Sequence, residues 1–364
     1  MFLVFFINEV ADVVETSRIG NVSSALAKSE IPPLAKASPN IKRDVYYIIF
    51  DAYTNSKSLK EYWNYDNSSF MQALTNRGFY IAKDSHSNYE LTPLSVSSSL
   101  NSNYHSFNDI VKNIPDEAQF YFKHKYSSSI INYFQSIGYS FINYSIFEYN
   151  KVPAIHHIIT FNIDPLHNFY SFVFYQTCFG KIYDKAFSRL QKNTAALWQD
   201  NLETVEMVNE LVQQKSDAPR FVYIHFVAPH PPYYFTENGS IRPESEAIKE
   251  FNKDYYLSQL IYTNTLALKT VDAILHHAHV APIIIVQGDH GSRIIPGKKG
   301  DDEATSILNA FYFPDSQYQS LYPSISPVNT FRVVLNQFFN QNIPLLKDTS
   351  YLLARKYFFV PPEH

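Results

Sequence analysis

Cysteine is nearly absent from this sequence of 364 residues, which contains only Cys178. A single cysteine excludes a disulfide within the chain and a metal cluster held by several thiolates. We interpret Cys178 as a small core residue, because free cysteine is among the most frequently buried residue types. The cysteine count leaves the cellular compartment open.

A basic surplus is also lacking. The 30 Lys and Arg residues are outnumbered by 34 Asp and Glu residues, and the net charge is -4. No stripe of basic residues is present, so nucleic acid is not an expected partner. The sequence has no GxGxxG motif and no Walker loop, so nothing in it indicates a dinucleotide site or a P-loop.

The apolar stretch that opens the sequence is short. It runs from Met1 to Ile7, and seven residues cannot span a bilayer. No basic residue precedes it and no small-residue cleavage site follows closely, so a complete signal peptide is not indicated. Two interpretations remain: a first helical turn packed on the domain, or the trailing end of a membrane helix. We favour the second, because of a resemblance described below.

The composition is that of a folded globular protein. Hydrophobic residues make up 45% and charged residues 18%, and the length allows one large α/β domain or two smaller ones. Residues 8 to about 42 are polar and include two adjacent prolines. We therefore predict a leader or linker over 1–42 and a folded domain over 43–364. An insertion of helical and aromatic character is expected around 115–200.

Apolar runs of strand length alternate with helical patterns along the domain. Short continuous apolar runs are typical of strands that are buried on both faces of a parallel sheet. Strands are predicted at Val45–Phe50, Phe79–Ala82, Tyr139–Asn143, Phe221–Val227, Ile283–Val286 and Leu308–Phe313. Helices are predicted around Phe70 and Leu74, and over about 195–212, 254–276 and 330–339. This alternation predicts an α/β fold with a mainly parallel central sheet and helices on both faces.

Ionisable side chains follow two of the predicted strands. Asp51 ends the first strand, and Asp289 and His290 follow the run of β-branched residues in a turn between Gly288 and Gly291. Ligands of open α/β sheets bind beyond the carboxyl ends of the strands. Carboxylate and imidazole groups are good ligands for zinc or a similar divalent ion. The alternative is a turn aspartate beside a surface histidine.

The pair Thr92-Pro93 predicts a helix start, with Thr92 as the N-cap and Pro93 at the first helical position. Free backbone N–H groups at a helix N-terminus favour an anion such as phosphate or sulfate. The alternative is that Thr92 is only a cap. With Asp51, Asp289 and His290 around a metal, the Thr92 hydroxyl is predicted to fill an open position and act as the nucleophile.

Two further groups are candidates for contacts with the substrate. His225 and His230 lie near the end of the strand predicted over Phe221–Val227, and prolines surround His230. We expect His230 to protonate a leaving group or to stabilise charge in the transition state. Arg293 and Lys298 belong to a basic, glycine-containing loop after the Asp289-His290 pair, interpreted either as a solvated loop or as a clamp for an anionic substrate.

Taken together, four stretches resemble the sulfatase-like branch of the alkaline phosphatase superfamily. They are the strand ending in Asp51, the Thr92 segment, the stretch from His225 to Tyr233 and the Asp289-His290-Gly291 turn. They cover about residues 43–315, and Ile325–Arg332 also resembles a stretch in the tails of sulfatase-domain proteins of this branch. Similar proteins include the lipoteichoic acid synthases and the phosphoethanolamine transferases.

Those enzymes are tethered to membranes, with an extracytoplasmic catalytic domain, a threonine nucleophile and one zinc or manganese ion. The resemblance implies an alkaline-phosphatase-like catalytic domain in the periplasm or at the cell surface, associated with the membrane. It implies a metal held by Asp51, Thr92, Asp289 and His290. It also implies a phosphate- or sulfate-ester substrate, which includes esters linked to lipids.

The sequence also departs from the pattern of true sulfatases. Those enzymes convert the Cys or Ser of a C/S-x-P-x-R motif to formylglycine, whereas Thr92 is followed by Pro93, Leu94 and Ser95 with no arginine in place. The methyl group of threonine blocks oxidation to an aldehyde. Asp51 is followed by alanine instead of a second aspartate. Only His364 follows His290, so one metal is expected instead of two.

We therefore predict a metal-dependent phospho-group transferase or phosphodiesterase that acts through a covalent phosphothreonine intermediate at Thr92. The first alternative is a sulfatase in which Thr92 only positions water. The second is a non-catalytic domain of the same fold that binds a partner or a glycan.

Overall fold

The computed structural model describes residues 34, 42–105, 128–145, 147, 149, 195–247 and 252–352. Cys178, the stretch from Met1 to Ile7 and His364 lie outside these ranges, as do most of the predicted leader and most of the predicted insertion around 115–200. The predicted domain boundary at residues 42 and 43 stays a prediction. Within the described ranges, no helix has the length and apolarity needed to cross a membrane.

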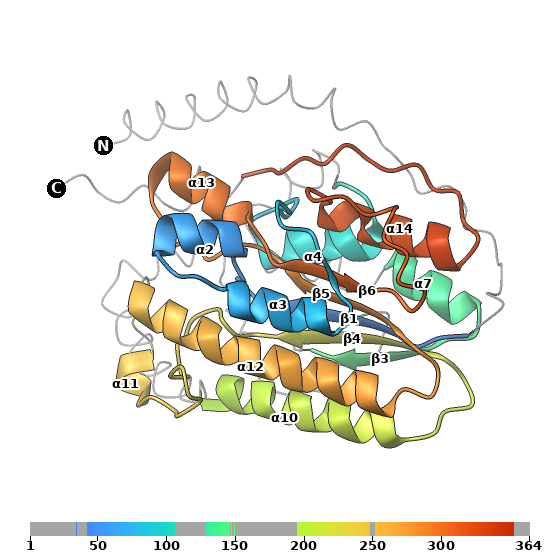
Figure 1. Ribbon diagram of the computed structural model, residues 1–364, viewed down its shortest axis with the longest axis horizontal. Coiled ribbons are helices and arrows are strands. Elements are labelled where there is room, and N and C mark those ends of the chain that lie inside the picture. The colour runs from blue at the N-terminus through green and yellow to red at the C-terminus, as the bar shows by residue number, and fades with distance from the viewer. Residues whose placement is uncertain are drawn as a thin grey trace, which may run out of the picture.

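A six-stranded sheet forms the centre of the fold, in the order β2-β6-β5-β1-β4-β3 (Figure 1). The strands are β1 (Val45–Phe50), β2 (Tyr80–Ile81), β3 (Ser140–Tyr144), β4 (Arg220–Phe226), β5 (Ile283–Gly288) and β6 (Asn309–Tyr312). β3, β4, β1 and β5 pair in parallel, whereas β6 is antiparallel to both β5 and β2. The predicted mainly parallel sheet is therefore confirmed.

The helices cover both faces of the sheet, as predicted (Figure 1). They are α2 (Ser56–Trp63), α3 (Ser68–Asn76), α4 (Thr92–Asn101), α7 (Ser129–Ser136), α10 (Ala195–Gln213), α11 (Glu244–Ala247), α12 (Lys253–His277), α13 (Gly297–Thr305) and α14 (Pro327–Phe338). Side chains of α4, α7 and α14 pack on one face, together with Tyr47 and Ile49 of β1. Side chains of α2, α3, α10 and α12 pack on the other face, together with Tyr46 and Ile48.

The register of β1 explains where polar side chains meet. Every residue of β1 and β5 is buried, which accounts for their continuous apolar character. Phe50 at the end of β1 pairs with Phe226 of β4 on one side and with Gly288 of β5 on the other. The residues that follow these three strands therefore emerge at the same edge of the sheet.

The expectation of a loop after the Asp289-His290 pair was wrong in part. The segment containing Lys298 was predicted to be a basic loop, but it belongs to helix α13. Glycines at 297 and 300 are usually signals for a loop. Here Gly297 has a φ of +70°, and the helix is packed so closely that the backbone N–H of Gly291 donates to the carbonyl of Ala304 at 2.8 Å.

Candidate active site

Asp51 is placed by the end of β1. Its backbone N–H donates to the carbonyl of Phe226 at 3.0 Å, which extends the β1–β4 pairing by one residue. The chain then turns sharply through Ala52, which has a φ of +62°. The Asp51 carboxylate is almost completely buried at this turn, and its Oδ1 accepts no hydrogen bond from any residue that the structure describes.

Asp289 is held by two backbone groups. Its Oδ1 accepts hydrogen bonds from the N–H of Ala52 at 2.9 Å and from the N–H of His290 at 2.8 Å. Its Oδ2 is buried and has no hydrogen-bond partner in the described part of the chain. One oxygen therefore fixes the side chain, and the other is presented to the cluster.

His290 completes a compact group of three ionisable side chains. Its Nδ1 lies 2.7 Å from the carbonyl of Gly291, so the proton belongs on Nδ1 and the lone pair on Nε2. That Nε2 lies 3.4 Å from Asp51 Oδ1 and 3.6 Å from Asp289 Oδ2. Burial, and then the charge of Arg293, lowers the pKa of His290 well below its usual range, so the imidazole is neutral.

This group fits a divalent cation. One ligand atom from each of Asp51, Asp289 and His290 can be chosen so that all lie within 4.8 Å of one another. Tetrahedral ligands at about 2.1 Å from zinc lie roughly 3.4 Å apart, which is close to the separations measured here. Burial, and then the neighbouring charge of Asp289, raises the pKa of Asp51 well above its usual range. Two buried carboxylates with unsatisfied oxygens beside a bare imidazole nitrogen are a suitable donor set for a positive ion.

Thr92 lies at the start of α4 and faces this group. The predicted N-cap role was wrong, since Leu91 is the N-cap and Thr92 is the first helical residue. The Thr92 hydroxyl lies 3.1 Å from His290 Nε2. The helix is tied to the end of β5 by Ser95, whose hydroxyl donates to the carbonyl of Asp289 at 2.6 Å.

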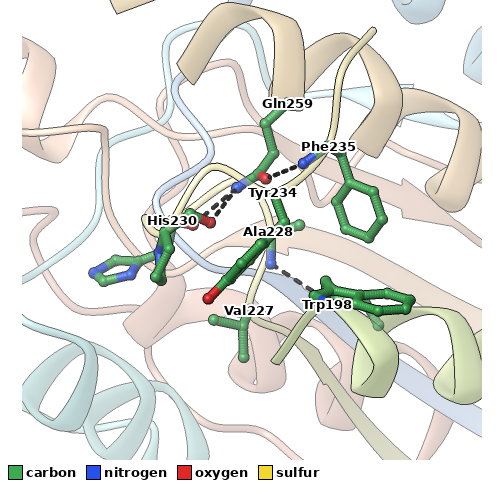
Figure 2. Close-up of a pocket in the computed structure, with 9 residues that line it drawn as sticks. Trp198, Val227, Ala228, His230, Tyr234, Phe235 and Gln259 are labelled. Carbon is green, nitrogen blue, oxygen red and sulfur yellow. Dashed lines mark hydrogen bonds between the residues drawn. The ribbon is translucent and has the colours of Figure 1, made fainter. Parts of the chain in front are cut away.

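His230 is held in a rigid loop after β4. Its backbone N–H donates to the carbonyl of Asp51 at 3.1 Å, and its own carbonyl accepts from Gln259 Nε2 of α12 at 2.9 Å. Figure 2 shows Gln259 bonded to the loop, with the His230 ring directed away from the cavity beside Trp198 and Phe235. The backbone hydrogen bonds of the loop therefore fix the direction of the His230 imidazole.

The His230 ring is a hydrogen-bond acceptor in this arrangement. Its Nδ1 lies 2.6 Å from the carbonyl of Pro231, so that nitrogen carries the proton. Its Nε2 faces Arg293 Nη2 at 3.4 Å. Burial, and then the charge of Arg293, lowers the pKa of His230 to about 3. The ring is therefore neutral, with its lone pair directed at the guanidinium.

Arg293 belongs to the loop after β5 and contacts His230 in the loop after β4. The Arg293 side chain is half-buried, and its backbone adopts a left-handed conformation with a φ of +61°. Its Nη1 donates to the carbonyl of Glu90 at 3.3 Å, in addition to the contact with His230. Arg293 lies close enough to Asp51 and His290 for its charge to lower the pKa of both. Its role as a clamp for an anionic substrate stays a prediction.

The other two predicted substrate contacts are placed differently. The His225 side chain is fully buried, with Nδ1 2.7 Å from the Tyr223 hydroxyl and Nε2 3.9 Å from Asp51 Oδ2. This buried position favours a role in orienting the Asp51 carboxylate over direct contact with a substrate. The backbone of Lys298 lies in α13, and its side chain is outside what the structure describes.

Sequence reasoning missed Glu303 of α13. This residue is completely buried and accepts hydrogen bonds from Thr54, Ser292 and Arg293. Burial raises the pKa of Glu303, and these hydrogen bonds oppose that effect. The sequence gives no signal for it, because a Glu after two Asp residues is usually part of a solvated surface.

A model of the family described as Sulfatase matches residues 45–331. The chain belongs to the sulfatase family. This confirms its placement in the sulfatase-like branch of the alkaline phosphatase superfamily and the predicted alkaline-phosphatase-like fold. Sulfatase-family domains act on sulfate or phosphate esters, so membership also supports the broad prediction of a hydrolase or transferase. No curated protein sequence matches the chain significantly.

Several solved structures are similar to this sulfatase-family chain. The C-terminal periplasmic domain of EptC from Escherichia coli, in complex with zinc, superposes with a TM-score of 0.52 at 12% identity, covering 85% of this chain and 86% of that one. A candidate sulfatase from Bacteroides thetaiotaomicron gives 0.50 at 13% identity, covering 87% and 74%. The periplasmic domain of phosphoethanolamine transferase EptC from Campylobacter jejuni gives 0.48 at 13% identity, covering 85% and 92%.

Proposed function

We propose that this chain is a metal-dependent phospho-group transferase or phosphodiesterase in which Thr92 is the nucleophile. The observation that carries the proposal is the position of the Thr92 hydroxyl, 3.1 Å from the bare Nε2 of His290. That nitrogen belongs to a group with the unsatisfied oxygens Asp51 Oδ1 and Asp289 Oδ2. A hydroxyl at a helix N-terminus beside such a group is suited to attack an anionic ester.

Asp51, Asp289, His290 and Thr92 would together hold one divalent ion, and zinc and manganese both suit these ligands. When bound, the ion would lower the pKa of the Thr92 hydroxyl and offset the negative charge of the ester. The surrounding backbone supports this role, because Ala52 and His290 N–H groups fix Asp289 while the carbonyl of Gly291 fixes the tautomer of His290. Such supporting contacts are typical of metal sites.

In the first half of the proposed reaction, Thr92 Oγ1 forms a bond to phosphorus and the ester oxygen of the leaving group departs. Thr92 gives up one proton and the leaving alcohol takes one, so the step is balanced. In the second half, water or an acceptor alcohol attacks phosphorus, and Thr92 Oγ1 is released and regains a proton. The covalent intermediate is phosphothreonine.

His230 and Arg293 have complementary parts in this scheme. The neutral His230 ring has its Nε2 lone pair on the side of Arg293, so it is suited to accept a hydrogen bond from the guanidinium and to orient it. The pKa of about 3 disfavours the predicted role as a standing acid. The Arg293 guanidinium binds the phosphoryl oxygens, as arginine does at many phosphate sites. Lys298 stays a further predicted contact.

We extend the proposal to an ester carried on a lipid or a glycan and presented outside the cytoplasm, with the protein associated with the membrane. The fold shared with the periplasmic domain of E. coli EptC supports this extension. The sequence resemblance to lipoteichoic acid synthases and phosphoethanolamine transferases supports it as well. The zinc in that EptC structure favours zinc among the candidate ions.

Replacing the nucleophile tests the proposal. Thr92→Ala is expected to lower turnover of bis-(p-nitrophenyl) phosphate at least about 1,000-fold, because nucleophile deletions have effects of that size. Metal content, measured by atomic emission, should fall little, because three ligands remain. Intact-mass spectrometry after quenching should find an added p-nitrophenyl phosphoryl group, which remains after one p-nitrophenolate has left, on the parent protein and not on the variant. Full activity of Thr92→Ala would exclude Thr92 as the nucleophile.

The family assignment also supports a second candidate, sulfate-ester hydrolysis. Thr92 cannot form formylglycine, so this reaction would need Thr92 to position water. Assays with p-nitrophenyl sulfate and with the phosphodiester at equal concentration separate the two reactions. A non-catalytic domain would turn over neither substrate and need not contain a stoichiometric divalent ion.

A further inference from the structure

Glu303 is a buried carboxylate with no cationic partner among the described residues. Its side chain lies in α13, between the loop after β1 and the loop after β5. Burying an unpaired carboxylate is costly unless several donors satisfy it. A solvated acid at this position would avoid that cost, so its burial requires an explanation.

Glu303 is satisfied by four donors that come from two loops. Oε1 accepts from the Thr54 hydroxyl at 2.8 Å, from the Ser292 N–H at 3.0 Å and from the Ser292 hydroxyl. Among the described residues, Oε2 accepts only from the N–H of Arg293, at 3.0 Å. The two oxygens therefore have different roles. Oε1 joins the two loops, and Oε2 fixes the backbone of Arg293.

The bond to Arg293 holds a strained residue. Its φ of +61° is unfavourable for residues other than glycine, asparagine and aspartate. Such strain persists only where neighbouring groups enforce it. This conformation brings the guanidinium to the carbonyl of Glu90 and to Nε2 of His230. A relaxed backbone at residue 293 would direct the side chain elsewhere.

We propose that Glu303 is a positioning residue that acts through Arg293. It holds the residue-293 backbone in the left-handed conformation, so that the guanidinium lies beside the reacting centre and binds the anionic part of the ester. The proposal rests on the assignment of Arg293 to the substrate anion made above.

Glu303→Gln tests this role selectively. A glutamine has one oxygen, and the three donors around Oε1 will take it. Its NH₂ group then faces the N–H of Arg293, donor against donor. Removing a negative charge near an anion site would by itself strengthen anion binding, whereas losing the position of Arg293 weakens it. The sign of the change therefore separates the two effects.

The experiment is a double-mutant cycle on the full chain loaded with zinc, with inorganic phosphate as the probe in titration calorimetry. Glu303→Gln should weaken phosphate binding about tenfold in the parent background and less than about twofold in an Arg293→Ala background, because residues that act together are not additive. Asp302→Asn, a loss of the same charge from an exposed neighbour on α13, should leave phosphate binding unchanged.

Equal weakening by Glu303→Gln in both backgrounds, unchanged phosphate binding, or loss of zinc from the variant would overturn the proposal. If Glu303→Gln does not fold, Thr54→Val replaces it, since this change removes one donor and leaves the carboxylate. It should weaken phosphate binding about threefold in the parent only, and Thr54→Ser should not. If the double-mutant cycle gives the expected phosphate affinities but the parent protein does not turn over the diester, the proposed function is wrong and the role of Glu303 is still supported.

Discussion

At the scale of single residues, hydrogen bonds to backbone carbonyls fix which nitrogen of each imidazole carries the proton. His290 and His230 each donate from Nδ1 to a carbonyl, at Gly291 and at Pro231, and so both present Nε2 as an acceptor. One lone pair faces the Thr92 hydroxyl and the other faces the Arg293 guanidinium. The neighbourhood therefore has two imidazole nitrogens that can accept a hydrogen bond or bind a cation, and neither imidazole is a standing acid.

Arg293→Ala is the prediction that belongs to this scale. A charged hydrogen bond contributes about 1.5–3 kcal/mol, so kcat/KM for the diester should fall by about 10- to 150-fold, with most of the change in KM. Steady-state kinetics measure this. Lys299→Ala removes an exposed positive charge from the neighbouring helix α13 and should change kcat/KM little. Equal kinetics of the two variants would contradict the anion-binding role.

The residues at the strand ends could be predicted because their signal is local. An apolar run followed by Asp51, or by Asp289 and His290, identifies both the strand and its polar end. Thr92 was found by the helix-start pattern, although the helix begins one residue earlier than that pattern implies. Glu303 has no local signal, because only the packing of α13 against two distant loops makes its surroundings dry.

At the scale of elements, α13 and the turn after β5 are packed at backbone contact. A Cβ atom on Gly291 would lie 1.7 Å from the carbonyl oxygen of Glu303, a distance that requires the backbone to move. A glycine at this point is therefore a condition for α13 to cover the turn that contains Asp289 and His290. The sequence showed the glycine but not the helix that requires it.

Gly291→Ala should lower the free energy of unfolding by about 2 kcal/mol or more, because the added methyl group has no space. It should also weaken zinc binding, since His290 is the adjacent residue. Gly138→Ala is the matched control: its Cβ meets nothing within 4 Å, and only the φ of +89° is unfavourable. Chemical denaturation and zinc titration should show a smaller loss of stability and unchanged zinc affinity for Gly138→Ala. Unchanged zinc binding by Gly291→Ala would contradict this expectation, because it would show that displacing the backbone at residue 291 does not disturb His290.

Helices and strands with a strong hydrophobic pattern could be predicted from the sequence, and those with a weak pattern could not. The fully buried strands β1, β4 and β5 and the long helices α10 and α12 appear where the sequence predicted them. The pattern failed at α13, whose sequence has two glycines and two lysines and little that is apolar. Tertiary contact, including the hydrogen bond from Gly291 to Ala304, stabilises that helix more than its own propensity does.

At the scale of the whole molecule, the proposed cation opposes repulsion between two buried carboxylates. Chelation by EDTA should therefore lower the melting temperature, and restoring zinc at 100 times its Kd should add about 2.7 kcal/mol of stability. Asp51→Asn removes one of the two charges. In differential scanning calorimetry the metal-free variant should melt above the metal-free parent, and zinc should raise its melting temperature much less. A metal-free variant that melts below the metal-free parent would contradict the repulsion.

The groups that form the proposed cage are contributed by segments far apart in the chain, at residues 51, 92 and 289–290. During synthesis, the early part of the polypeptide leaves the ribosome with an isolated aspartate and an isolated threonine, neither of which retains an ion. Loading with the cation is therefore an event of the finished chain. Protein made under metal starvation should accumulate in an empty form and become active when the ion is supplied later, without new synthesis.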